Sequence, residues 1–116
     1  SLKSLSEQDL VTVVVDGETY TGFVSYYYHD ESERIDGIPT RGSLSVDVEL
    51  DTETVKEKDL PSHQLQMSVR EKRPGKWDEP SVHIWDPVAD ENGHLLENEY
   101  TDIGEINKIE RREESD

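Results

Sequence analysis

Between Ser43 and Asp51, apolar and polar residues alternate without interruption, with leucine or valine at every second position. Because successive side chains of a β-strand point to opposite faces, this pattern predicts a half-buried strand of an antiparallel sheet. The wider composition agrees, since the chain has eleven valines but only one alanine, Ala89. Valine favours strands, and alternation with so little alanine argues against a helical bundle.

Turn signals divide the chain into further strands. Asp16-Gly17 predicts a hairpin between a strand at 10–15 and a long strand at 18–28. Pro74 and Gly75 would occupy the centre of a type II turn between strands at 65–69 and 81–85. We expect Gly22 to mark a bulge or bend in the long strand.

The remaining segments carry weaker patterns. Ser6 to Asp9 has the pattern of a helix start, which predicts a short N-terminal helical turn. Residues 29–42 form an expected polar loop, and Asp86-Pro87 is expected to end the strand at 81–85. Isoleucines at 103, 106 and 109 suit either a helix or a strand over 102–112.

Together these patterns predict a single all-β domain, mainly antiparallel, spanning residues 1–116. We expect a small SH3-like or Sm-like barrel of five or six strands with a short N-terminal helix. A β-sandwich is the alternative. The charged tail at 110–116 is expected to fray.

One segment resembles the first half of the Sm fold's motif. Residues 13–28 carry the similar spacing, through Gly17, Tyr20, Gly22, Val24 and Tyr27. The family's RNA-contacting Asp-x-x-x-Asn loop is not matched, because 29–33 holds Asp30 but no asparagine. Arg41-Gly42 lies too early for the second half of the motif. The resemblance therefore implies barrel geometry and does not carry over the family's RNA-binding residues.

The acidic charge is the strongest compositional feature. Aspartate and glutamate number 28 against 12 lysines and arginines, for a net charge of −16. Such a charge destabilises a folded chain by self-repulsion in dilute buffer, but at ~1 M salt the Debye length falls to about 3 Å. We therefore expect adaptation to a high-salt cytoplasm; an ordinary solubilising surface is the alternative.

Cysteine and long apolar segments are both missing from the sequence. The chain has no cysteine, which excludes disulfides and thiolate metal sites. No apolar run approaches the ~20 residues of a membrane span. We expect a cytoplasmic protein without a membrane partner, and homo-oligomerisation through an edge strand is possible.

A basic island is the foremost candidate site. Four cations and a tryptophan fall close together, at Arg70, Lys72, Arg73, Lys76 and Trp77. Guanidinium groups bind phosphate or carboxylate, and a tryptophan can stack on a base. The island is therefore a candidate contact for nucleic acid or an acidic protein. The alternative is that it neutralises nearby carboxylates such as Glu71 and Asp78.

Other motifs are less specific. Asp90, Asn92, Gly93 and Glu99 fit four positions of an EF-hand loop, but Val88 stands at its first position and offers no ligand oxygen. The four histidines are scattered. We therefore expect neither a metal site nor a cofactor.

Three tyrosines at 26–28 lie on one expected strand, so their rings should alternate between its two faces. We expect Tyr26 and Tyr28 to share the face of Tyr20 and Val24, with Tyr27 on the face of Phe23. An uncovered face could bind a partner, and a strand buried on both sides is the alternative.

No catalytic motif is present in the sequence. The chain is expected to be a non-enzymatic binding or accessory domain with the basic hairpin at 70–77 as its contact surface. Two alternatives remain. One is an acidic nucleic-acid mimic that binds a basic protein, and the other is an enzyme whose site is assembled only in three dimensions.

Overall fold

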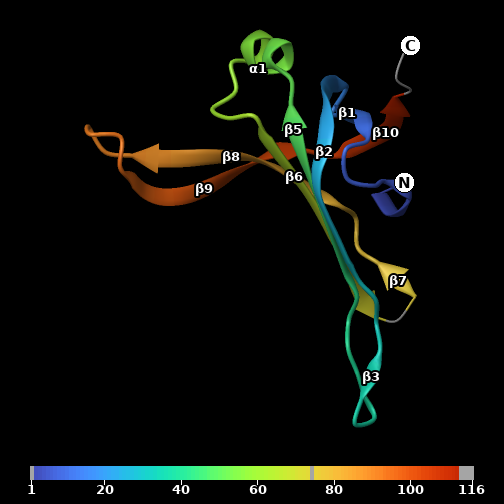
Figure 1. Ribbon diagram of the computed structural model, residues 1–116. Helices are drawn as coiled ribbons and strands as arrows, with labels where there is room; N and C mark the ends of the chain where they lie inside the picture. The colour runs from blue at the N-terminus through green and yellow to red at the C-terminus, as the bar shows by residue number, and fades with distance from the viewer. Residues whose placement is uncertain (1, 74, 113–116) are drawn as a thin grey trace.

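The computed structural model describes residues 2–73 and 75–112, and antiparallel strands make up most of it (Figure 1). The strands are β1 (Leu10–Val15), β2 (Glu18–Asp30), β3 (Arg34–Ile35), β4 (Ile38–Pro39), β5 (Ser43–Leu50), β6 (Gln64–Arg73), β7 (Lys76–Trp77), β8 (Ser81–Ala89), β9 (Leu95–Gly104) and β10 (Ile106–Arg112). A 3-10 turn, Leu2–Ser4, precedes them, and one α-helix, α1 (Thr52–Lys58), follows β5. The predicted all-β class is confirmed.

Eight strands form one sheet in the order β10-β1-β2-β5-β6-β8-β9, with β7 paired to β6. β3 and β4 form a separate two-stranded ribbon. The described residues contain no second large sheet, which a β-sandwich would require. The sheet is open in its hydrogen-bonded order and does not form a closed barrel, although a single residue, Glu105, joins its two end strands.

The core lies on one face of this sheet. In β5 the side chains of Leu44, Val46, Val48 and Leu50 are buried while their neighbours are more exposed, so the predicted alternation is confirmed. Alternate residues of β1, β6 and β8 join them. Each fully buried aliphatic side chain contributes roughly 1.5–3 kcal/mol, and this shared face fixes the register of the long strands.

A bulge in β2 changes which side chains face this core. The pairing of β2 with β5 shifts between Val24 and Tyr26, three residues after Gly22. Gly22 instead permits close contact with β5, because a Cβ there would lie 2.1 Å from the carbonyl oxygen of Glu49. The expected position of the bulge was therefore wrong, and Gly22 serves interstrand contact.

The bulge also reverses the expected faces of the tyrosines. Val24 pairs with Val48 and is fully buried, whereas beyond the bulge Tyr27 pairs with Val46 and packs against the core. Tyr26 and Tyr28 therefore point outward, with 46% and 48% of their surface exposed. The expectation that they share the face of Val24 was wrong, because one extra residue exchanges the two faces of a strand.

Several local expectations need correction. Residues 6–9 form a turn and not the start of a helix. The backbone N–H of Ser6 closes this turn by donating a hydrogen bond to the Asp9 carboxylate. The true α-helix starts after Asp51, whose side chain accepts a hydrogen bond from the N–H of Thr54. This cap satisfies a donor that the first helical turn leaves free.

Two expected breaks are occupied by strands. The polar loop at 29–42 contains the β3–β4 hairpin, which turns at Asp36-Gly37 with positive φ at both residues. β8 continues past Pro87. At this position β8 pairs with β9 on one edge and has no partner strand on the other, so a proline, which has no N–H, is tolerated there.

The C-terminal segment is strand and not helix. β9 and β10 cover 95–104 and 106–112, so residues 110–112 of the expected tail are paired with β1. Residues 113–116 lie outside the described part of the chain, as does Pro74 of the expected turn. Gly75 has φ +82°, as the third position of a type II turn requires.

Candidate functional site

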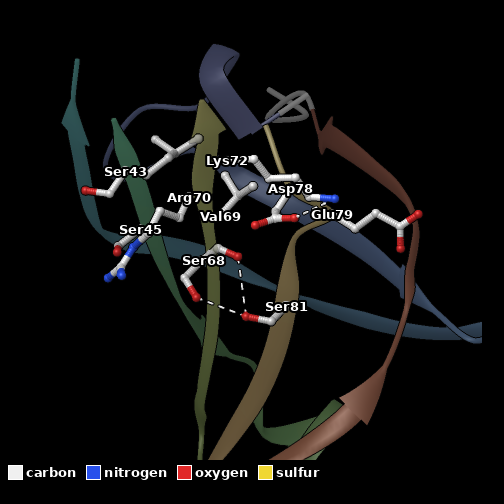
Figure 2. A pocket seen from close by; sticks show the side chains of 10 residues that line it. Ser43, Ser45, Ser68, Val69, Arg70, Lys72, Asp78, Glu79 and Ser81 are labelled. Atoms are coloured by element: carbon white, nitrogen blue, oxygen red, sulfur yellow. Dashed lines mark hydrogen bonds and ion pairs between the residues drawn. The ribbon is translucent and has the colours of Figure 1, made fainter. Parts of the chain in front are cut away.

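A polar groove of about 640 Å³ lies along β5, β6 and the start of β8 (Figure 2). Four serine hydroxyls, two cations and two carboxylates supply most of its polar groups. These residues are Ser43, Ser45, Ser68, Ser81, Arg70, Lys72, Asp78 and Glu79. The groove therefore unites Arg70 and Lys72 of the predicted basic island with hydroxyl groups for which the sequence carries no motif.

The two cations of the groove differ in their surroundings. The Lys72 ammonium lies 3.2 Å from the Asp78 carboxylate, and both side chains are well exposed. In Figure 2 the side chain of Arg70 extends from β6 toward β5, whereas Lys72 lies on the opposite side beside Asp78. Arg70 has no ion pair with any carboxylate in residues 2–73 and 75–112. Its guanidinium can therefore bind an external anion without breaking an internal pair.

A row of aligned side chains extends the groove across four strands. Tyr28 of β2 pairs with Ser45 of β5, Ser45 pairs with Ser68, and Ser68 pairs with Ser81. Directly opposed residues of antiparallel strands share a face with their Cβ atoms ~5 Å apart. The hydroxyls of Ser68 and Ser81 are 3.0 Å apart. Tyr28 thus lies on the same face as the hydroxyls of the groove.

A second row lies beside the first and is more acidic. It runs from Tyr26 through Asp47 and Gln66 to His83. Burial raises the pKa of Asp47, and a hydrogen bond from Gln64 opposes this rise. The outer face thus combines two exposed tyrosines with Arg70 and several hydroxyls.

Glu71 lies on the inward face of β6, behind the strand segment that carries Arg70 and Lys72. Its side chain is buried, and its two carboxylate oxygens accept hydrogen bonds from the N–H groups of Gly42 and Gly75, at 2.7 Å and 2.8 Å. Gly42 directly precedes β5, and Gly75 lies in the β6–β7 turn. Glu71, which lies between Arg70 and Lys72 in β6, therefore links β6 to the start of β5 and to the β6–β7 turn.

The other three residues of the predicted island lie elsewhere. Trp77 pairs with Glu71 and so shares its inward face. The indole packs against the core, 6.1 Å from the ring of His29. Arg73 and Lys76 are exposed at the tip of the β6–β7 hairpin. The structure thus separates Trp77 from Arg70 and Lys72, which point to the opposite face.

The sequence pattern alone does not show that Tyr26 and Tyr28 are the exposed rings. The run of three tyrosines was a visible signal, but only the bulge in β2 decides which rings are exposed. The segment that fits an EF-hand loop is the turn between β8 and β9, where Asp90 accepts hydrogen bonds from the N–H groups of Asn92 and His94. Among the described residues, no group of three histidine or carboxylate side chains could hold a metal ion.

No family model matches this sequence, and neither a curated protein nor a solved structure is significantly similar to it. None of the helices formed by the described residues has the length and apolar character needed to cross a membrane. The geometry of the outer face is therefore the basis for a functional proposal.

Proposed function

We propose that this chain is a non-enzymatic binding domain that holds single-stranded nucleic acid on the outer face of β2, β5 and β6. The observation that carries the proposal is the position of Tyr28, an exposed ring in line with the hydroxyls of the groove that contains Arg70. Exposed aromatic rings on a sheet stack with unpaired bases, and arginine and serine side chains donate to phosphate oxygens.

The arrangement suits a single strand better than a duplex. Tyr26 and Tyr28 lie two residues apart on one face, so their separation along the strand is about 7 Å. This is about the phosphate-to-phosphate repeat of an extended single strand, so that two neighbouring bases can meet two rings. Arg70 and the hydroxyls of Ser43 and Ser45 would then contact the phosphates between or beside those bases.

The acidic charge is accounted for by the expected high-salt cytoplasm. Aspartate and glutamate side chains in the described residues are exposed, with five exceptions at Asp9, Asp47, Glu71, Asp86 and Asp90. Carboxylates so widely spread would repel a polyanion in dilute buffer. At ~1 M salt the Debye length of about 3 Å leaves only direct contacts effective, which favours binding through a few local donors.

We also propose that the sheet curls toward the small barrel expected from the sequence. β10 pairs with β1 at one end of the strand order, β9 pairs with β8 at the other, and only Glu105 separates these two strands. Asp16 spans the junction, because its carboxylate accepts the N–H of Glu105. Nuclear Overhauser contacts between side chains of β1 and β8 across the core would test this curvature; their absence would refute it.

The binding proposal is tested by fluorescence anisotropy with labelled oligo-dT and oligo-rU of about twelve nucleotides in ~1 M KCl. We expect saturable binding by the unmodified chain. Tyr28→Ala should weaken it about tenfold or more, because one base stack contributes roughly 1–3 kcal/mol. Arg70→Gln should weaken it as well.

The matched control is Tyr100→Ala, which removes a tyrosine of equal exposure, 48%, from β9. We expect this change to leave oligonucleotide affinity unaltered. Equal weakening by Tyr100→Ala and Tyr28→Ala, or no saturable binding in ~1 M KCl, would refute the proposal. Circular dichroism of each variant must match that of the unmodified chain.

A further inference from the structure

The outer part of β8 and β9 forms a projecting two-stranded ribbon, which we call the β8–β9 arm (residues 85–100). β6 pairs with β8 only as far as Ile84, so beyond that residue β8 pairs with β9 alone. Figure 1 shows this ribbon extending away from the other strands. An isolated two-stranded ribbon is marginally stable in water, so an arm of this length gains from a covering partner.

One face of the arm is apolar. Trp85 pairs with Tyr100, Pro87 with Asn98, and Ala89 with Leu95, and directly opposed residues share a face. Tyr100 and Leu95 are 48% and 54% exposed. Among these six, the indole N–H of Trp85 donates a hydrogen bond to the side-chain oxygen of Asn98 at 3.0 Å. The face therefore combines apolar area with few free polar groups.

The opposite face of the arm is acidic. Asp86 pairs with Glu99, and Val88 pairs with Glu97. Between Trp85 and Asp102 the chain has six carboxylates and no lysine or arginine, and those carboxylates are Asp86, Asp90, Glu91, Glu97, Glu99 and Asp102. The arm is thus an amphipathic ribbon whose charge has one sign.

The apolar face continues into a cavity at the root of the arm. Trp85 borders this cavity of about 480 Å³ together with Ser25, Glu49, Ser62, His63 and Gln64. An extended segment lying along the arm could therefore place one side chain in the cavity and further apolar side chains on Tyr100 and Leu95. Its backbone could also pair with the free edge of β9, which is unpaired on that side within the described residues.

We propose that the β8–β9 arm docks a basic partner protein through an extended segment in which apolar residues alternate with lysine or arginine. Charge selects this occupant. The carboxylates of the arm complement cations and repel nucleic acid. They also disfavour a second copy of this chain, because antiparallel pairing of β9 with itself would bring Glu97 and Glu99 of two copies together. The surface lies apart from the groove of Arg70 and Tyr28, so the two proposals can fail separately.

The test uses a labelled peptide of about ten residues that alternates valine and lysine, with the full chain, in ~0.15 M and ~1 M KCl. Fluorescence anisotropy should show saturable binding at both salt concentrations, because apolar contacts persist when charges are screened. A serine–lysine peptide of equal charge and a valine–glutamate peptide should bind at least about tenfold more weakly.

The site is assigned with a double variant, Leu95→Ser with Tyr100→Ser, which should weaken binding of the valine–lysine peptide at least about tenfold. Its matched control is Ile35→Ser with Ile38→Ser, since these side chains are 54% and 67% exposed on the β3–β4 hairpin. The control should bind as the unmodified chain does, and both variants should keep its circular dichroism spectrum.

Three results would overturn the assignment. The first is no saturable binding of the valine–lysine peptide, or equal binding of the serine–lysine peptide. The second is equal weakening in the Ile35/Ile38 control. The third is a dimer in sedimentation equilibrium that the Leu95/Tyr100 variant abolishes, because the face would then be covered by a second copy.

Discussion

Replacing Glu71 with glutamine tests how the segment of β6 behind the groove is held. The buried carboxylate accepts N–H groups from Gly42 and Gly75 with separate oxygens. Glutamine keeps only one acceptor oxygen, so its amide N–H₂ would face one of these donors. A hydrogen bond to a charged group contributes roughly 1.5–3 kcal/mol, and an unsatisfied buried donor costs about 1–3 kcal/mol. Easier burial of the neutral amide offsets part of this loss, which leaves a net destabilisation of about 2 kcal/mol.

The measurements are urea unfolding and thermal unfolding in ~1 M KCl, both followed by tryptophan fluorescence. A loss of about 2 kcal/mol corresponds to a melting temperature lower by roughly 8 °C in a domain of this size. Glu79→Gln is the matched control, because Glu79 lies exposed on the rim of the same groove. It should change the free energy of unfolding by less than about 0.5 kcal/mol. A Glu71→Gln variant as stable as this control would refute the inferred role of Glu71.

Three further predictions concern the fold and its response to solution conditions. Gly22→Ala should destabilise the chain by about 3 kcal/mol in urea unfolding, because the added Cβ would overlap the backbone of β5. Partial burial raises the pKa of Asp51, but hydrogen bonds from Thr21 and Thr54 outweigh this and hold that pKa below its usual value. Asp51→Ala should therefore cost about 1 kcal/mol at neutral pH, and the difference in urea unfolding should shrink as the pH falls through the lowered pKa of Asp51. Oligonucleotide affinity measured by anisotropy should rise between ~0.1 M and ~1 M KCl, because screening removes the repulsion between the −16 charge and the oligonucleotide faster than it weakens the contact of Arg70 with phosphate. A steady fall in affinity would refute this.

The long strands could be predicted because burial on one face leaves a regular pattern. Each inward position of β5 is leucine or valine. The hairpin between β1 and β2 has its own turn signal in Asp16-Gly17, where both residues have positive φ. These features act locally, so neighbouring residues are enough to read them. The open strand order could not be read in this way, because it depends on β10 returning to β1 across about ninety residues of chain.

Two missed elements had local signals that competed with stronger ones. Asp36-Gly37 between Ile35 and Ile38 is a hairpin signal, but the surrounding residues are polar and indicate a loop. Asp51 is a good helix cap, but α1 has only seven residues and buries little beyond Thr54. Short elements of this kind depend on tertiary contacts more than on their own sequence pattern. Thr54 supplies one such contact, because its hydroxyl oxygen accepts a hydrogen bond from the N–H of Thr21.

The candidate site was only partly predictable, because its composition depends on which face each residue occupies. Proximity in sequence grouped Trp77 with Arg70, but Trp77 pairs with the buried Glu71 and must face the core. The bulge after Val24 has the opposite effect on β2, since it turns Tyr28 outward and aligns it with Ser45. The bulge thus exposes a ring that an unbroken strand of the same sequence would bury, in place of the tryptophan that the sequence pattern suggested. Deleting Ser25 should therefore leave Tyr28 outward, because Val24 opposite Val48 would then be followed directly by Tyr26 opposite Asp47, whereas an unbroken strand that keeps Ser25 would turn Tyr28 toward the core.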